Sequence, residues 1–115
     1  MTEDLYKGGH YAQAFPLLQK AVESGDDLAA AYLGEIYEYG MGVVPKDEVR
    51  AVSCYRRAAN AGSALGMNDL GLMYEGGRGG LPKDERTAVT WYRKAADAPG
   101  TNNLDGNIRG SNNLA

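Results

Sequence analysis

Few residues of this 115-residue chain belong to the types that perform catalysis or bind metals, since it has one histidine, His10, and one cysteine, Cys54. A zinc site needs several such ligands brought together, and these two are far apart in the sequence. Arg56 and Arg57 are close enough to Cys54 to lower the pKa of its thiol. Burial of Cys54 as a packing residue is nevertheless the favoured interpretation, and His10 is expected to be a solvated turn residue.

The serines and the glycine-rich loops do not form known catalytic patterns either. No histidine neighbours a serine, and no Gly-x-Ser-x-Gly turn is present; the serines concerned are Ser24, Ser53 and Ser63. The glycine-rich segments 40–42 and 76–80 have no predicted strand before them and no Gly-Lys-Ser or Gly-Lys-Thr after them, which argues against phosphate binding. The sequence therefore predicts no catalytic residue, no cofactor and no metal site, so we expect a protein that is not an enzyme.

The charge and hydropathy of the chain exclude two further classes of function. Twelve basic and fifteen acidic residues give a net charge of -3, without the basic patch that a nucleic-acid-binding protein needs. The longest wholly apolar run, residues 28–33, is too short to insert into a membrane. Residues 1–4 are acidic, unlike the start of a signal peptide. We expect a soluble, cytoplasmic protein, or a periplasmic one if a signal peptide has been removed.

The chain repeats itself at an offset of 37 residues, as the alignment of 33–59 with 70–96 shows. The matching segments are Leu33-Gly34 with Leu70-Gly71, Tyr37-Glu38 with Tyr74-Glu75, Pro45-Lys46-Asp47-Glu48 with Pro82-Lys83-Asp84-Glu85, Ala51-Val52 with Ala88-Val89, and Ala58-Ala59 with Ala95-Ala96. A period between 20 and 50 residues is typical of a solenoid built from stacked supersecondary units.

Each period predicts two antiparallel helices. The first covers residues 28–39, with Asp26 or Asp27 as N-cap and Gly40 as its left-handed stop. The second covers 47–61, with Asp47 as N-cap. Its buried face is predicted to consist of Ala51, Tyr55, Ala58 and Ala59. The same arrangement is predicted for residues 64–76 and 84–98.

Gly34 and Gly71 lie inside predicted helices, where glycine costs about 1 kcal/mol relative to alanine. A contact between helix backbones would offset that cost. We therefore predict that the first helix of each repeat packs closely on the second, where Ala58 and Ala95 are also small.

The sequence resembles the Sel1-like repeat family, a relative of the tetratricopeptide repeats. The resemblance rests on Leu-Gly, then Tyr, Gly-x-Gly and Asp, followed by Ala-Val-x-x-Tyr-x-x-Ala-Ala, and the second copy matches best, at 70–79 and 88–96. Cys54 stands where the family usually has tryptophan, which predicts a smaller side chain and looser packing there. The resemblance implies an all-α fold, an α-α superhelix (solenoid) of antiparallel helix pairs.

The repeats are expected to form one domain over residues 1–100. It comprises two full repeats, 25–61 and 62–98, after a partial tetratricopeptide-like repeat at 1–24, in which residues 11–24 form the second helix. Residues 101–115 are rich in asparagine and glycine, which favour turns, so this tail is expected to be irregular or disordered, with Leu104 and Ile108 as candidate anchors.

The resemblance implies that another protein or a peptide binds the concave groove, lined by the first helices. The outward positions predicted for this groove are Leu28, Ala31, Glu35, Glu38, Tyr39, Leu65, Asn68, Leu72 and Glu75. The two copies differ here, since Glu35 aligns with Leu72 and Tyr39 with Gly76. Such divergence fits a shaped binding surface, and it also fits a solvated face that varies freely.

Three functions remain open at this point. The leading one is a protein-binding adaptor of bacterial origin. The second is a structural module that forms homo-oligomers through its uncapped helix ends, because open apolar faces associate. The third is a weak hydrolase.

Overall fold

The computed structural model describes residues 2–42 and 44–98, and all regular structure in these ranges is helical. The predicted all-α superhelix is confirmed. The elements are α1 (Thr2–Lys7), α2 (Tyr11–Glu23), the 3-10 helix η1 (Asp27–Ala29), α3 (Ala30–Tyr39), α4 (Glu48–Asn60), α5 (Ala64–Gly76) and α6 (Glu85–Asp97). The predictions for the tail 101–115, with Leu104 and Ile108, lie outside the described residues.

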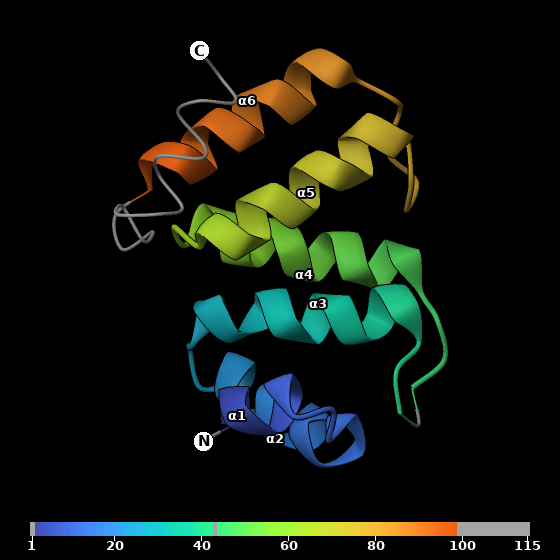
Figure 1. Ribbon diagram of the computed structural model, residues 1–115, viewed down its shortest axis with the longest axis vertical. Helices are drawn as coiled ribbons and strands as arrows, with labels where there is room; N and C mark the ends of the chain where they lie inside the picture. Colours follow the sequence, from blue (N-terminus) through green and yellow to red (C-terminus); the bar gives the residue numbers. More distant parts are fainter. Residues whose placement is uncertain (1, 43, 99–115) are drawn as a thin grey trace.

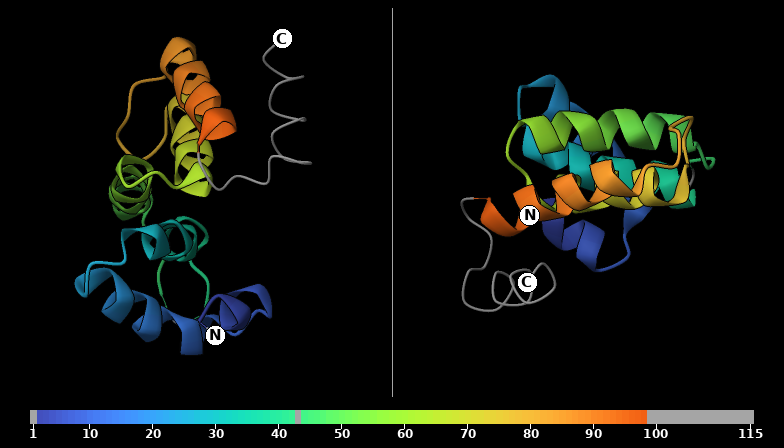
Figure 2. Two further views of the ribbon diagram at one scale, coloured as in Figure 1. Left: turned by 90° about the vertical axis from the view of Figure 1, so that its left-hand side faces the viewer. Right: turned by 90° about the horizontal axis from the view of Figure 1, so that it is seen from above.

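The helices of the pairs α3–α4 and α5–α6 run antiparallel, and the pairs stack in chain order (Figure 1). The helices α1 and α2 form one end of the stack, α3 and α4 the middle, and α5 and α6 the other end (Figure 1). Seen from the side, each pair is rotated relative to the previous one, as in a superhelix (Figure 2). The main contacts between consecutive pairs run from α2 to α3 and from α4 to α5.

The ends of the helices repeat as the sequence predicts. Gly40 and Gly77 adopt the left-handed conformation, with φ of 67° and 63°, after α3 and α5. Asp47 accepts a hydrogen bond from the backbone nitrogen of Arg50 at 3.0 Å, and Asp84 caps α6 in the same way. The caps therefore confirm the helix starts and stops that the period indicates.

The start of α3 differs from the prediction. Residues 27–29 form η1, and α3 begins at Ala30 without a side-chain cap, so neither Asp26 nor Asp27 caps it. Asp27 instead accepts a hydrogen bond from Nε of Arg57 at 2.6 Å. A charge-assisted bond of this kind is stronger than a neutral capping bond, which explains why the carboxylate turns away from the helix.

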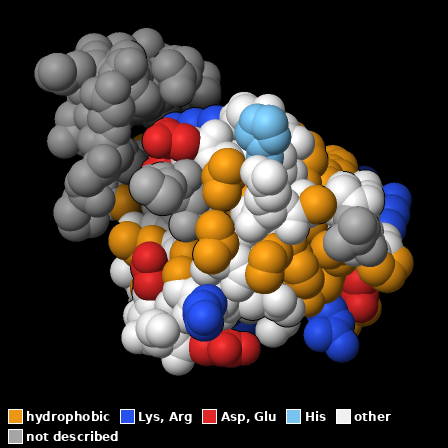
Figure 3. Space-filling model, turned by 90° about the horizontal axis from the view of Figure 1, so that it is seen from below, with side chains coloured by type: hydrophobic (Ala, Val, Ile, Leu, Met, Phe, Trp, Pro, Cys, Tyr) orange, Lys and Arg blue, Asp and Glu red, His pale blue; other side chains and the backbone are white. Residues whose placement is uncertain are grey.

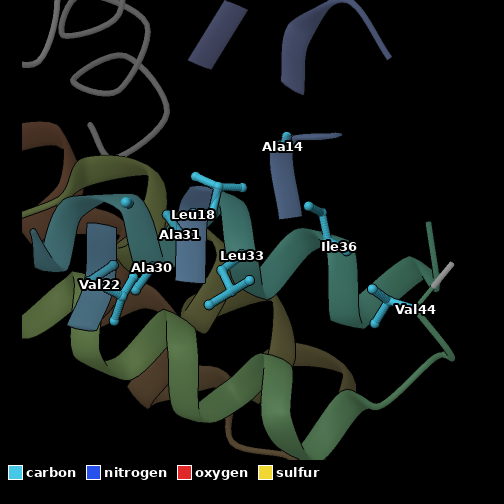
Figure 4. Packing of buried hydrophobic residues seen from close by; sticks show 10 residues of the cluster. Ala14, Leu18, Val22, Ala30, Ala31, Leu33, Ile36 and Val44 are labelled. Carbon is cyan, nitrogen blue, oxygen red and sulfur yellow. The ribbon is translucent and has the colours of Figure 1, made fainter. Parts of the chain in front are cut away.

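Two hydrophobic clusters form the core. Figure 4 shows the first, between α2 and α3, whose labelled members are Ala14, Leu18, Val22, Ala30, Ala31, Leu33, Ile36 and Val44. The second joins α4, α5 and α6, and includes Ala51, Val52, Tyr55, Ala59, Met67, Leu70, Met73 and Ala95. The predicted inner face of α4 is confirmed, because all four of its residues are buried.

The helical glycines Gly34 and Gly71 permit close packing of each first helix on the second helix of its repeat. A Cβ atom on Gly34 would lie 2.6 Å from Cε1 of Tyr55, and one on Gly71 would lie 2.6 Å from Cε1 of Tyr92. Ala58 instead faces α5, where a Cβ on Gly66 would lie 2.6 Å from it. The predicted close packing of the first helix on the second is therefore confirmed, with a tyrosine ring against each glycine.

Candidate partner-binding site

The first helices of the repeats lie beside one another. The hydroxyl of Tyr6 on α1 donates a hydrogen bond to Oε1 of Glu35 on α3, and Tyr32 on α3 donates one to Glu3 on α1 at 3.0 Å. Helix α3 also contacts α5 directly. We call the surface shared by α3 and α5 the first-helix face; its residues are Glu35, Tyr39, Asn68 and Leu72.

These residues are accessible to different degrees. Tyr39 is 60% exposed and Leu72 is 50% exposed, although both are large hydrophobic side chains. Asn68 is exposed and Glu35 is half-buried. The face therefore combines an aromatic ring, an aliphatic side chain and a carboxylate.

Three further predicted groove residues lie outside the first-helix face. Leu28 is exposed but belongs to η1, which packs on α2, α3 and α4. Leu65 is half-buried and packs against the first hydrophobic cluster. Glu75 is exposed and accepts a hydrogen bond from the hydroxyl of Tyr92 at 2.5 Å.

Two residues predicted to point outward are instead buried. Ala31 belongs to the first hydrophobic cluster. Glu38 is buried because its Oε1 accepts a hydrogen bond from Tyr55 at 2.5 Å and its Oε2 lies 2.9 Å from Nη2 of Arg78. Both placements correct the predicted orientation, since contacts from other helices turn these positions inward.

Arg78 joins the second repeat to the first. Its Nη2 lies 2.5 Å from Oε2 of Glu48 as well as 2.9 Å from Glu38. The hydrogen bond from Arg78 lowers the pKa of Glu48. Arg78 aligns with Met41 in the first copy, so this ion pair is not part of the repeated pattern.

Asp69 on α5 is the least satisfied polar side chain among the described residues. It is 9% exposed, and no described donor reaches its Oδ2. It lies within hydrogen-bonding reach of Glu35, and Glu38 adds a second negative charge. Burial, followed by these two neighbours, raises the pKa of Asp69 to about 9. Asp69 therefore holds a proton at neutral pH.

The sequence reasoning missed Asp69, Arg78 and Tyr6, although one signal was present. Asp69 aligns with Tyr32 in the repeat, so an acidic group replaces an aromatic one. It also adjoins Leu70, which is fully buried. A charged residue among buried positions of a helix indicates a special environment.

Neither His10 nor Cys54 lies in surroundings typical of a catalytic residue. His10 is exposed, and Figure 3 shows this histidine at the surface of the N-terminal end. Burial raises the pKa of the Cys54 thiol to about 11, although Arg50 and Arg57 act in the opposite direction. The interpretation of Cys54 as a packing residue is thereby supported, since a thiol with a raised pKa is a poor nucleophile.

Residues 2–42 and 44–98 contain neither a metal-binding cluster nor a helix able to span a membrane. In these ranges, no group of three or more His, Cys, Asp or Glu side chains is arranged to hold a metal ion. None of the helices described is both long enough and apolar enough to cross a membrane.

Comparison with known proteins places the chain among helical repeat proteins. The Sel1 repeat family matches residues 11–26, 27–63 and 64–99. None of the curated proteins compared with the chain matched it.

Two solved structures are similar to this one. A Sel1 repeat protein from Oxalobacter formigenes is 38% identical, with a TM-score of 0.74 over 84% of this chain and 39% of that one. The second is c5321, a protective antigen present in uropathogenic Escherichia coli strains that displays an SLR fold. It is 29% identical, with a TM-score of 0.76 over 96% of this chain and 23% of that one.

The chain thus spans less than half the length of either neighbour. Both neighbours come from bacteria, which agrees with the predicted bacterial origin. Sel1 repeats generally mediate protein–protein interactions. The match over three consecutive segments, together with the stacked helix pairs, shows that this chain belongs to the Sel1 repeat family.

Proposed function

We propose that the chain is a protein-binding module that receives a peptide or a partner protein on its first-helix face. The observation that supports this most is the exposure of Tyr39 and Leu72, two large hydrophobic side chains, on adjacent first helices. Aromatic and aliphatic anchors of this kind supply much of the binding energy of protein interfaces.

The repeat frame supplies a second reason. Structural positions such as Leu33 and Leu70 agree between the copies, whereas Glu35 aligns with Leu72 and Tyr39 with Gly76. A surface that differs between copies on a shared scaffold suits recognition of an asymmetric partner. The module acts through binding, and the proposal gives no residue a catalytic role.

Replacing Tyr39 and Leu72 together with alanine is expected to weaken binding of the partner captured from the source organism at least about 30-fold, or roughly 2 kcal/mol. The loss is expected because both anchors are removed. Since both side chains are exposed, the free energy of unfolding should change by less than about 1 kcal/mol. Isothermal titration calorimetry with the purified partner measures the binding effect.

A matched control removes exposed hydrophobic side chains from elsewhere. Leu17 on α2 and Val49 on α4 are 42% and 65% exposed. Their double alanine variant is expected to bind the partner as the wild-type protein does. If the Tyr39→Ala, Leu72→Ala variant bound the partner as tightly as the wild-type protein does, the first-helix face would not be the binding site.

Self-association through α6 is the second candidate function. Val89 is 40% exposed, whereas its counterpart Val52 is 7% exposed and lies against the loop at Gly79. Arg93 corresponds to Arg56, which donates a hydrogen bond to Tyr74 on α5 at 3.2 Å. The surface of α6 around Val89 and Arg93 therefore corresponds to the surface of α4 that packs against the next repeat.

Light scattering across a concentration series tests this second function. The mass of the wild-type protein is expected to rise with concentration, and Val89→Glu should keep the protein monomeric because a charge on the contact disfavours burial. Val49→Glu, on exposed α4 surface, serves as the control. A wild-type protein that stays monomeric at millimolar concentration contradicts self-association.

A further inference from the structure

Among the described residues, no cation forms an ion pair with Asp69. Its carboxyl group faces Glu35 and lies near Glu38. Among the described residues, neither Glu35 nor Asp69 forms an ion pair, and the nearby guanidinium of Arg78 is held by Glu38 and Glu48. A buried carboxyl group without a donor is costly, so such groups normally have a partner.

The groups around Asp69 come from three other helices and from the loop after α5. They are Tyr6 on α1, Glu35, Glu38 and Tyr39 on α3, and Tyr55 on α4, with Arg78 beyond Glu38. Tyr6 and Tyr55 both donate their hydrogen bonds to glutamates, so neither hydroxyl hydrogen is directed to Asp69. Apart from the proton that Asp69 itself holds, no donor from these groups reaches its Oδ2 atom.

Asp69 borders the first-helix face along α5, although its own side chain is largely buried and its Oδ2 atom is closed to solvent. Asn68 and Leu72 lie one residue before and one turn after Asp69 on α5, and both are exposed. Tyr39 is also exposed, and its pKa is raised by partial burial and by the nearby carboxylates of Glu38 and Asp69. An arginine side chain entering here would have Tyr39 and Leu72 beside its aliphatic stem, and guanidinium groups pack favourably on aromatic rings.

We propose that Glu35 and Asp69 form a receptor for a guanidinium group, so that the partner bound by the first-helix face inserts an arginine side chain between α3 and α5. This inference rests on the proposed function and specifies the chemistry of the partner. A guanidinium group provides several donors in one plane, which suits two neighbouring carboxylates and reaches the Oδ2 atom that no described donor reaches.

Binding of the cation displaces the proton that Asp69 holds at neutral pH. The affinity for an arginine side chain should therefore increase with pH, by up to about tenfold per unit between pH 6 and pH 8, because the ionised receptor binds the cation. A purely structural carboxyl pair would not produce this dependence.

The first experiment uses a small probe on the intact chain. Nα-acetyl-arginine methylamide is titrated while the carboxyl carbon of Asp69 is followed by NMR, and the matched citrulline compound, which is neutral, serves as the control. The arginine probe is expected to lower the pKa of Asp69 by at least about one unit, and the citrulline probe to leave it unchanged. Equal responses to the two probes, or no response to either, would overturn the proposal.

The second experiment separates this inference from the proposed function. Random peptides displayed on phage are selected on the wild-type protein, and each selected peptide is measured with arginine or citrulline at its basic position, against wild type and Asp69→Asn. The inference predicts that the arginine peptide loses at least about tenfold in affinity on Asp69→Asn. The citrulline peptide should bind both proteins equally.

The peptide experiment distinguishes failure of the arginine receptor from failure of the proposed binding function. Selected peptides that require Tyr39 and Leu72 but show no preference for arginine would overturn the receptor and retain the proposed function. Selected peptides that bind the Tyr39→Ala, Leu72→Ala variant as tightly as the wild-type protein would overturn both. Glu75→Gln, which removes an exposed carboxylate of α5 that Tyr92 already engages, should leave the arginine preference unchanged.

Discussion

Gly34→Ala is expected to lower the free energy of unfolding by about 2 kcal/mol, although alanine is the better helix former. The added Cβ would lie 2.6 Å from Cε1 and 2.7 Å from Cδ1 of Tyr55. That ring cannot move easily, because it is fully buried and its hydroxyl group is bonded to Glu38. Overpacking costs about 3 kcal/mol in such a site, and helix propensity offsets about 1 kcal/mol. Urea unfolding followed by circular dichroism measures the difference.

Two other glycines provide matched comparisons for Gly34. Gly71→Ala meets Tyr92 at the same 2.6 Å, but Tyr92 is only half-buried and can tilt, so we expect a smaller loss of about 1 kcal/mol. Gly76→Ala meets only side-chain carbons of Arg78 and should leave stability nearly unchanged. A Gly34→Ala protein as stable as the wild type would contradict the close approach of α3 to Tyr55.

The stability of the wild-type protein is expected to fall as the pH rises from about 5 to about 9, and Asp69→Asn should remove most of that fall. The pKa of Asp69 is raised to about 9 in the folded protein, chiefly by burial, whereas an unfolded aspartate titrates near pH 3.9. Between these values the folded state keeps a proton that the unfolded state has released. The stabilisation is therefore complete below about pH 4 and is lost as the pH rises through about 9.

We expect the wild-type protein to lose up to about 4 kcal/mol between about pH 5.5 and pH 8.5, at about 1.4 kcal/mol per pH unit. Asp69→Asn should vary little, because an asparagine amide can donate to Glu35 at any pH. Glu48 and Asp84 have lowered pKa values. Their contributions are lost only at acidic pH, below this window. Chemical denaturation at a series of pH values measures the effect.

An exposed carboxylate on the same helix provides the control for Asp69. Glu75→Gln is expected to follow the wild-type curve, since Glu75 is exposed. If the curve of Asp69→Asn ran parallel to that of the wild-type protein, Asp69 would not be the titrating group. A gain in stability on removing a carboxyl group, together with a loss of binding, is the relation expected of a functional site.

The repeat frame could be predicted because its signals are local and occur twice. Gly40 and Asp47 mark helix ends through their own backbone and side-chain geometry. Ala51 and Tyr55 fall on one face of α4 by helical spacing alone. The start of α3 could not be predicted in this way, because Asp27 is engaged by Arg57 from the next helix.

The candidate site was predictable only in part, because the contacts of some of its residues come from other helices. Tyr39 and Leu72 are exposed, as their helical spacing relative to Leu33 and Leu70 predicts. Glu38 turns inward because Tyr55 and Arg78 supply its partners. The environment of Asp69 is assembled from several helices, so its raised pKa has no counterpart in the sequence pattern around it.

The location of the partner on the chain tests the account most directly. Backbone amide NMR spectra of the chain, recorded with and without a peptide selected on it, identify the residues whose surroundings change on binding. We predict the largest shifts at residues 35–39 of α3 and 68–72 of α5. Shifts confined to the outer surface of α4 and α6, with these two segments unchanged, would contradict binding at the first-helix face.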